Sequence, residues 1–461
     1  MKNKILSVAL MAVAAICIIC VPFAANNGDN DIPVVQPDVT QTTTVTTVPE
    51  DDISVADTSE VTGTTVSESG TTISGTAAET TSEDEKTTTA ADGKTTTAAN
   101  SKTTTAKKTT TTTKKVTTAA PKPAPTTKAT TKKPQTQAPK PAPAPKPESG
   151  TPVANHGQLS VKGANIVDKN GKVYQIRGMS THGIMWEDFS NILSKDSLKV
   201  LRDDWGCNTI RIAMYTEEWG GYTTGSDFAR QAKEKVNMGV ANATDLGMYV
   251  IIDWHILHDN NPQTHQKEAI AFFTEMSQKY ANYNNVLYEI CNEPNGGASW
   301  NGNVKPYADA VIPVIRKYDS DAIIICGTPT WSQDIHEAAN NRLSDKNTVY
   351  ALHFYANTHT QWLRDRVQQC YNSGLPILVS EFGTCDASGN GGFNAGETQN
   401  WFTMLDKLNI GYLNWSACGK SETASAFKSG TNLSAIQSGT GQLTESGKIV
   451  REHLRKRAGL Q

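Results

Sequence analysis

The 461-residue sequence lacks the signals of several protein classes. Beyond residue 25 it has no CxxC pair and no Cys/His cluster at metal-ligand spacing, which argues against a cysteine-based metal site. Its formal net charge is only −3, so it has no excess of basic residues for nucleic acid or an anionic membrane surface. No GxGxxG motif follows the first expected strand, which disfavours a dinucleotide-binding sheet.

Cysteine also gives no basis for a disulfide framework. Two of the eight cysteines fall in the N-terminal segment, and six remain in the rest of the chain. An even number in a secreted protein would permit disulfides, but Cys291 and Cys326 lie in apolar, strand-like runs. We therefore expect buried free thiols at Cys207, Cys291, Cys326, Cys370, Cys385 and Cys418.

The first 25 residues have the layout of a secretory signal peptide. Lys2 and Lys4 precede an apolar core from 5 to 21, and small residues follow around Ala24. The alternative is a retained anchor, although the apolar core is short for a bilayer span. A lipid anchor at Cys20 is disfavoured because Ile19 stands where a small residue is needed. We expect a secreted, extracellular protein, with association at the cell surface left open.

Residues 26–155 are dominated by Thr, with Ser, Ala, Lys and Pro. Such a segment has too little apolar surface to offset the entropy lost on ordering, so it predicts a disordered linker. Its Thr and Pro content would suit O-glycosylation. Its later part is rich in Lys, which makes it a candidate for contact with an anionic cell-wall polymer, although such a Lys run is more often simply a solvated linker.

Residues 156–461 show a regular alternation of apolar and amphipathic segments. After an expected hairpin over 158–173 with its turn at 168–171, eight strand-like runs cover 175–179, 207–214, 248–254, 285–291, 322–326, 349–354, 376–381 and 412–416. Helical spacing covers 197–205, 228–246, 266–280, 304–318, 362–373, 395–408 and 445–458. Eight such units predict a (β/α)₈ TIM barrel, with a doubly wound open sheet as the alternative.

Two of the expected strands end in glutamates. Glu293 follows the fourth run and Glu381 ends the seventh, so both should lie at the C-terminal edge of the barrel. Two carboxylates that converge on one bond can serve as acid and nucleophile in glycosidic cleavage. Polar and aromatic residues gather at the same strand ends, namely His182, Trp186, Arg211, Tyr215, Trp254, His255, Asn292, Trp331, His353, Tyr355 and Trp415. Together these residues predict one site.

Residues 157–461 resemble glycoside hydrolase family five, and most closely its bacterial endo-β-1,4-glucanases. The resemblance rests on eight ordered segments, which are 157–186, TIRIAMY (209–215), DWHI (253–256), YEICNEPNG (288–296), GTPTWSQD (327–334), LHFYA (352–356), VSEFGT (379–384) and LNWSACGKSETASAF (413–427). The expected signal peptide and linker take no part in it.

The resemblance implies that Glu293 is the acid/base and Glu381 the nucleophile of a retaining double displacement. It assigns Arg211 and Tyr355 to the support of Glu381, and Asn292 to the sugar 2-hydroxyl. It implies that the remaining polar contacts to sugar come from His182, Tyr215, His255, His353, Lys420 and Glu422. As flat sugar platforms we expect Trp186, Trp300, Trp331 and Trp415. Trp205 and Trp401 fall in helical segments and predict packing, and Trp362 stays unassigned.

The interpretation is a secreted endo-β-1,4-glucanase acting on cellulose and related β-glucans. Mannanase, xylanase or mixed-linkage glucanase activity would use the same pair of glutamates, and a non-catalytic carbohydrate-binding barrel is the alternative from another class. A cell-surface structural role would explain the linker but not the strand-end residues. We expect a monomer that needs no metal or cofactor for its chemistry, and a structural cation is left open.

Overall fold

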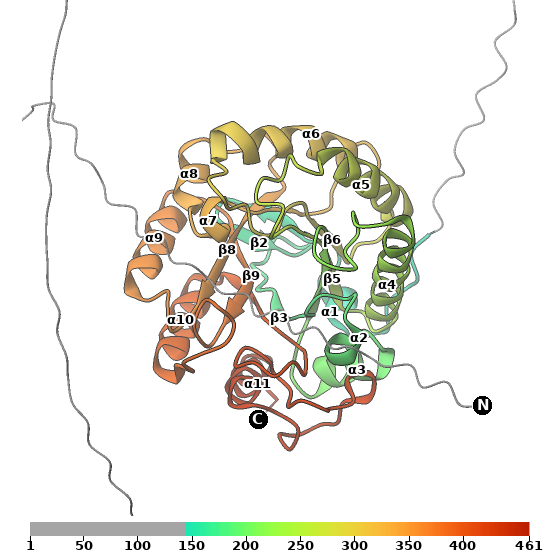
Figure 1. The fold of residues 1–461 in the computed structure, drawn as a ribbon, viewed down its shortest axis with the longest axis vertical. Coiled ribbons are helices and arrows are strands. Elements are labelled where there is room, and N and C mark those ends of the chain that lie inside the picture. The colour runs from blue at the N-terminus through green and yellow to red at the C-terminus, as the bar shows by residue number, and fades with distance from the viewer. Residues whose placement is uncertain (1–142, 461) are drawn as a thin grey trace, which may run out of the picture. The chain divides into compact units, whose positions relative to one another are not determined.

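The computed structural model describes residues 143–460. Eight parallel strands close into a barrel in the order β10-β3-β4-β5-β6-β7-β8-β9 (Figure 1). The strands are β3 (Arg177–Ser180), β4 (Thr209–Tyr215), β5 (Tyr249–His255), β6 (Val286–Glu289), β7 (Ile324–Cys326), β8 (Thr348–Tyr355), β9 (Ile377–Gly383) and β10 (Gly411–Asn414). Each coincides with one of the eight expected runs to within a few residues, which confirms the (β/α)₈ barrel.

Helices surround the barrel, and the long ones match the segments with helical spacing. These are α3 (Lys195–Asp203), α4 (Ser226–Asp245), α5 (Gln266–Tyr280), α6 (Lys305–Arg316), α9 (Gln361–Asn372), α10 (Ala395–Leu408) and α11 (Glu445–Ala458). The sequence analysis did not predict the short elements α1 (Pro152–His156), α2 (Glu187–Ser190), α7 (Pro329–Ser332), α8 (Ile335–Asn340), the π-helix η1 (Trp300–Val304) and the 3₁₀ helix η2 (Leu433–Ala435).

Local capping explains where several of these helices begin and end. The side chains of Ser194, Asn394 and Thr444 accept hydrogen bonds from backbone N–H groups in the first turns of α3, α10 and α11. These contacts satisfy donors that have no partner within the helix. Helix α11 ends at Gly459, whose φ of 73° suits a residue without a Cβ.

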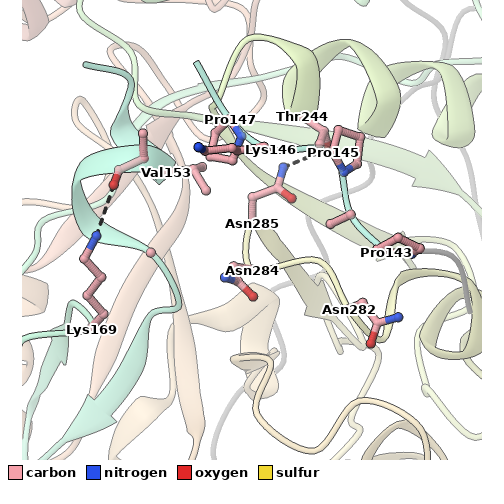
Figure 2. A pocket seen from close by; sticks show the side chains of 13 residues that line it. Pro143, Pro145, Lys146, Pro147, Val153, Lys169, Thr244, Asn282, Asn284 and Asn285 are labelled. Atoms are coloured by element: carbon pink, nitrogen blue, oxygen red, sulfur yellow. Dashed lines mark hydrogen bonds between the residues drawn. The ribbon is translucent and has the colours of Figure 1, made fainter. Parts of the chain in front are cut away.

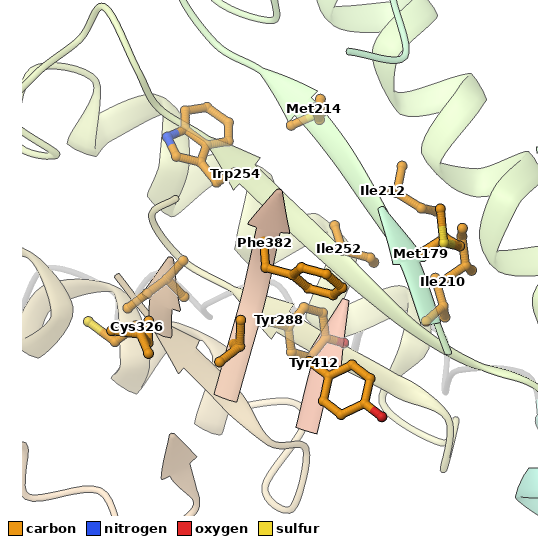
Figure 3. Close-up of a cluster of buried hydrophobic side chains, with 14 of the residues drawn as sticks. Met179, Ile210, Ile212, Met214, Ile252, Trp254, Tyr288, Cys326, Phe382 and Tyr412 are labelled. Atoms are coloured by element: carbon orange, nitrogen blue, oxygen red, sulfur yellow. The ribbon is translucent and has the colours of Figure 1, made fainter. Parts of the chain in front are cut away.

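Strand residues alternate between the barrel interior and the helix layer. On β4, Ile210, Ile212 and Met214 belong to the large cluster that packs against the helices (Figure 3). A separate cluster fills the lower barrel, with Tyr249, Ile251, Leu287, Ile323, Ile325, Val349, Ala351, Leu378 and Leu413 among its members. Side chains thus fill the N-terminal half of the barrel, and the polar groups described below lie above them.

A hairpin of β1 (Ser160–Lys162) and β2 (Asn165–Val167) packs into this lower cluster through Ile166. The pairing of Lys162 with Asn165 puts its tight turn at residues 163–164, which the sequence analysis did not predict. The expected turn at 168–171 is confirmed, because Val167 pairs antiparallel with Val173 across it. The segment 168–171 forms a second turn, closed by the bond from Gly171 N–H to the Asp168 carbonyl. A single bridge between Val167 and Val173 continues the pairing beyond it.

The folded region begins before residue 156. Helix α1 lies within the segment that the sequence analysis gave to the linker, and its Val153 is buried in the lower cluster. The backbone N–H of Val153 also bonds to the carbonyl of Gly247, just before β5. The expected signal peptide (1–25) and the expected linker up to residue 142 lie outside the described residues.

A hollow of about 840 Å³ lies at the N-terminal end of the barrel (Figure 2). Its lining includes Pro143, Pro145 and Pro147, together with Asn284 and Asn285 from the segment that enters β6. Lys146 and Lys169 also line it, but no carboxylate does, so this hollow lacks the pair of acids that glycosidic cleavage requires. The two glutamates lie at the opposite end of the strands.

The six cysteines in the described part of the chain are free and buried, which confirms the expectation of buried thiols. None of the described helices combines the length and apolarity that crossing a membrane requires.

Gly178 offers a test of strand packing in the barrel. A Cβ at this position would lie 1.8 Å from the carbonyl oxygen of Thr209 on the neighbouring strand β4. We expect Gly178→Ala to lower the free energy of unfolding by at least about 2 kcal/mol, because the backbone must shift. Gly441→Ala is the matched control, since a Cβ there meets nothing within 4 Å. Denaturant midpoints measure both, and equal midpoints would contradict the close packing of β3 on β4.

Candidate active site

The two predicted glutamates lie at the C-terminal end of the barrel, on different segments. Glu381 lies on β9, and Glu293 lies in the segment that follows β6. A carboxylate oxygen of Glu293, one of Glu381 and a ring nitrogen of His353 all lie within 4.8 Å of one another. Both glutamates are buried, with exposed fractions of 9% and 4%. The sequence therefore located two carboxylates that the fold brings together.

A β-bulge on β9 sets the direction of Glu381. On β8, Ala351 and His353 are two residues apart, but their partners Leu378 and Glu381 on β9 are three apart. The pairing of β9 with β10 shows the same extra residue. Because a bulge breaks the alternation of a strand, Ser380 and Glu381 can both face the barrel interior. Their hydrogen bonds, described next, place both of them there.

Two donors hold the carboxylate of Glu381. Tyr355 Oη donates to Oε1 at 2.9 Å, and Arg211 Nη1 donates to Oε2 at 3.1 Å. The pKa of Glu381 is raised, because burial and the charge of Glu293 outweigh the lowering effects of His353, Arg211 and the hydrogen bond from Tyr355. The support that the resemblance assigned to Arg211 and Tyr355 is thus present in the structure as direct contacts.

His353 links the other glutamate to the barrel interior. Its Nδ1 donates to Glu293 Oε1 at 2.8 Å, and its Nε2 donates to Ser380 Oγ at 2.9 Å. Burial alone would lower the pKa of His353, but the charge of Glu381, the nearby carboxylate of Glu289 and the hydrogen bond to Glu293 raise it to about 9. His353 is therefore an imidazolium near neutral pH, and it is a poor metal ligand because metal binding requires a neutral ring.

Arg211 is the centre of a buried network that the sequence analysis identified only in part. Its Nε donates to Glu289 Oε2 at 2.7 Å, and its Nη2 lies 3.0 Å from Asp253 Oδ2. The same Nη2 donates to Asn292 Oδ1 at 2.5 Å. Asp253 and Glu289 were missed, although a charged residue inside an apolar strand run is a signal that the sequence offers. Both are fully buried.

The network around Arg211 determines the protonation states of Glu289 and His255. Burial would raise the pKa of Glu289, but Arg211 and His353 lower it to about 2, so this carboxylate stays ionised. Burial lowers the pKa of His255 well below its usual range, helped by the charges of Arg211 and His353. A neutral His255 can donate from Nδ1 to Asp253 at 2.7 Å and accept at Nε2 from Asn292 at 3.3 Å. Asn292 is thereby oriented from two sides.

Aromatic rings line the wall of the site next to the glutamates. Tyr215 lies 4.1 Å from His255 and 4.9 Å from Trp186, between ring centroids. Trp415 packs on His182 and, nearly parallel, on His255 at 5.1 Å. Both tryptophans belong to this wall through these ring contacts. Trp186 is half-buried and Trp415 is 5% exposed.

Lys420 and Glu422 lie beside His182. Lys420 Nζ is 2.5 Å from Glu422 Oε2, and His182 Nε2 is 3.7 Å from Glu422 Oε1. Burial, together with the charge of Lys420, lowers the pKa of His182 to about 3. His182 is therefore a neutral hydrogen-bonding group near the rim, and its Nδ1 accepts from the N–H of Gly183.

Trp331 is placed beside Glu293 by an unusual backbone. Thr330, Trp331 and Ser332 have φ values of 56°, 51° and 57°, which side-chain-bearing residues rarely adopt. The backbone N–H of Trp331 bonds to the carbonyl of Pro294, and Ser332 Oγ donates to the carbonyl of Asn292. The indole is 46% exposed, so a large part of its surface is open to a sugar ring.

The assignment of Trp300 as a sugar platform is wrong. Its side chain is fully buried, its ring packs on Tyr350, and its indole N–H donates to the carbonyl of Asn341. Trp300 begins the π-helix η1 and therefore packs in the helix layer. Trp205 and Trp401 are also fully buried, as expected, and the unassigned Trp362 is 46% exposed on α9.

The contribution of His353 to the free energy of unfolding should depend on pH. The folded-state pKa of about 9 lies above the ordinary value of 6.5, so its contribution to stability is complete below pH 6.5 and is lost as pH rises through 9. We expect the difference in unfolding free energy between the wild type and His353→Asn to shrink by up to about 3 kcal/mol over this range. Denaturant titrations at several pH values measure it, with exposed His258→Gln as the control. A constant difference would contradict a charged His353.

The comparisons with known proteins agree with this geometry. A family model described as Cellulase (glycosyl hydrolase family 5) matches residues 167–421. Endoglucanase N of Pectobacterium atrosepticum is 50% identical over 312 residues, which are 68% of each chain. An endoglucanase of Clostridium saccharobutylicum is 49% identical over 298 residues, so that 65% of each chain is covered.

The solved structures give the same result. A variant of the catalytic domain of Thermobifida fusca endoglucanase Cel5A, in complex with cellotetraose, is 36% identical with a TM-score of 0.61. The match covers 66% of this chain and all of that domain. The matched family model spans both Glu293 and Glu381, and the barrel carries them at the strand ends. The chain therefore belongs to glycosyl hydrolase family 5, the cellulase family.

Proposed function

We propose that this protein is an endo-β-1,4-glucanase that cleaves internal bonds of cellulose-like chains with retention of configuration. The observation that carries the mechanism is the approach of Glu293 and Glu381, whose oxygens lie within 4.8 Å. Retaining glycosidases hold their carboxyl groups about 5–5.5 Å apart, whereas inverting ones leave about 6.5–9.5 Å for a water molecule.

Glu381 is the nucleophile in this proposal. One of its oxygens attacks the anomeric carbon while Arg211 and Tyr355 hold the carboxylate in a single orientation. The covalent glycosyl-enzyme formed in this step splits one difficult displacement into two easier ones. As the carboxylate loses charge on bond formation, Arg211 remains paired with Glu289, so no uncompensated cation is left behind.

Glu293 is the acid and base. It gives its proton to the leaving glycosidic oxygen, and then takes a proton from the water that attacks the glycosyl-enzyme. His353 holds the carboxyl group of Glu293 through Nδ1 and is itself held by Ser380. Asn292, fixed between Arg211 and His255, offers an amide to the sugar 2-hydroxyl.

The substrate assignment rests on the relatives and on the aromatic wall. Flat rings at Trp186, Trp331 and Trp415 suit the C–H faces of glucose, and Lys420 and Glu422 offer charged groups to its hydroxyls. The Pectobacterium atrosepticum and Clostridium saccharobutylicum relatives are endoglucanases, and the match spans about two thirds of their length. Mannan, xylan and mixed-linkage glucan are the competing substrates.

We also propose that the protein is secreted. The support is the sequence of residues 1–25, in which an apolar core follows two lysines and precedes small residues. An extracellular enzyme meets polymeric glucan that cannot enter a cell, which fits the proposed activity. The Thr- and Lys-rich residues that follow would carry any contact with the cell wall.

A substrate panel tests the activity. The full chain is incubated with carboxymethylcellulose, glucomannan, xylan and mixed-linkage β-glucan while viscosity and reducing ends are followed together. We expect viscosity of carboxymethylcellulose to fall well before reducing ends accumulate, because internal cleavage shortens chains most per bond broken. Greater activity on another polymer would overturn the substrate assignment, and no activity on any would favour a carbohydrate-binding barrel.

Azide rescue tests the roles of the two glutamates. Glu381→Gly should lose hydrolysis by at least about 1,000-fold and regain turnover with azide, which attacks from the vacated side and yields the inverted glycosyl azide. Glu293→Ala is the matched variant. It should still form a glycosyl-enzyme from substrates with good leaving groups and give the azide product of retained configuration. The opposite pattern of configurations would exchange the two assignments.

A further inference from the structure

A second cluster of ligand-type side chains lies outside the catalytic network. Glu217 follows β4, whereas Asp259 and His265 lie in the connection between β5 and α5. One ligand atom from each of the three residues lies within 4.8 Å of the others. His265 Nε2 is 3.6 Å from Asp259 Oδ1 and 3.7 Å from Glu217 Oε2.

Asp259 is the buried anchor of this cluster. Its Oδ2 accepts hydrogen bonds from the Thr216 hydroxyl and the Leu257 backbone N–H. Its Oδ1 is buried and has no hydrogen-bond partner, although the residue is only 5% exposed. His265 Nε2, which faces it, is likewise buried without a hydrogen bond. A buried polar atom without a partner is costly, and here two of them face one another.

The distances do not fit a histidine hydrogen-bonded to a carboxylate. An N–H···O hydrogen bond requires about 2.7–3.2 Å between heavy atoms. Elsewhere in this protein His255 lies 2.7 Å from Asp253, and His353 lies 2.8 Å from Glu293. His265 Nε2 instead lies about equally far from two carboxylates and bonds to neither.

The same distances fit three ligands around one ion. Zinc binds imidazole nitrogen and carboxylate oxygen at about 2.0–2.2 Å, so two ligands at a tetrahedral angle lie about 3.3–3.6 Å apart. Two carboxylates and a neutral imidazole would also balance the charge of a divalent cation. An imidazole ligand favours zinc-like ions over calcium and magnesium, which prefer oxygen.

We propose that Glu217, Asp259 and His265 bind a zinc-like divalent cation. Asp259 supplies a buried carboxylate, His265 supplies a buried Nε2 from a side chain that is 25% exposed, and Glu217, whose side chain is 47% exposed, closes the site from the solvent side. A fourth position is left for water. The site is separate from the catalytic glutamates and does not depend on the proposed activity.

The cation would fasten two loops at the rim of the barrel. The loop after β4 carries Glu217 and Trp219, whose indole is 78% exposed. The two loops are already joined by the bond from Thr216 to Asp259, and His258 N–H donates to Glu218. A metal bridge from Glu217 to His265 adds a third tie and holds the start of α5, where His265 is the residue before the helix.

Zinc binding to the full chain, stripped with chelator, tests the proposal. Calorimetry should show one equivalent of zinc bound at neutral pH, and zinc at 100 times the dissociation constant should raise Tm by about 3–6 °C. His265→Gln and Asp259→Asn should each lose this equivalent and the rise in Tm. His258→Gln is the matched control, because it removes a histidine from the same loop without touching the three ligands.

Three results would overturn the site. The first is no zinc binding below about 0.1 mM to wild-type protein. The second is an equivalent of zinc that survives both His265→Gln and Asp259→Asn, which would place the zinc at other residues. The third is equal loss in His258→Gln. Apo-state Tm values of all variants show whether each is folded, and Glu217→Gln, at an exposed position, provides a ligand variant with little effect on folding.

Discussion

The structure depends on one buried cation. Arg211 is fully buried and reaches Asp253, Glu289, Glu381 and Asn292 from strand β4. Isolated charges in a protein interior are costly, and removal of one partner leaves the others uncompensated. These residues come from four different parts of the barrel, so the charge balance can be met only when the strands are in register. Catalytic geometry and barrel closure are therefore linked through the same guanidinium.

The carboxylates near Arg211 have different partners and therefore different roles. Glu289 is held by Arg211 and Ser380, both inside the barrel, and stays ionised. Glu381 shares Arg211 but turns its other oxygen to Tyr355. Glu293 has no contact with Arg211 among the hydrogen bonds found and is paired with His353. The cation thus separates the structural carboxylate Glu289 from Glu381 and Glu293, the two groups proposed for catalysis.

Much of this could be predicted from the sequence, because the signals were local. The helix over residues 395–408 was predicted with the bounds of α10, since its amphipathic period is unbroken. Trp300 was misplaced because its sequence position, near the NEP segment, does not reveal that η1 turns the ring toward Tyr350. The bulge on β9 and the cluster around Asp259 depend on how distant segments align, and no local pattern encodes that. Glu289 could have been predicted as a site residue, because it is a charged residue inside an apolar strand run.

The filled lower barrel sets the route by which molecules come and go. The cluster around Ile251, Leu287 and Ile325, with the β1–β2 hairpin beneath it, leaves no passage through the barrel axis. Substrate can reach the glutamates only from the face that carries them, and both products must leave by that face. A polymer can then lie across the mouth with both of its ends in solvent. The enzyme would have no need to find a chain end, and each encounter with a glucan strand could be productive anywhere along its length.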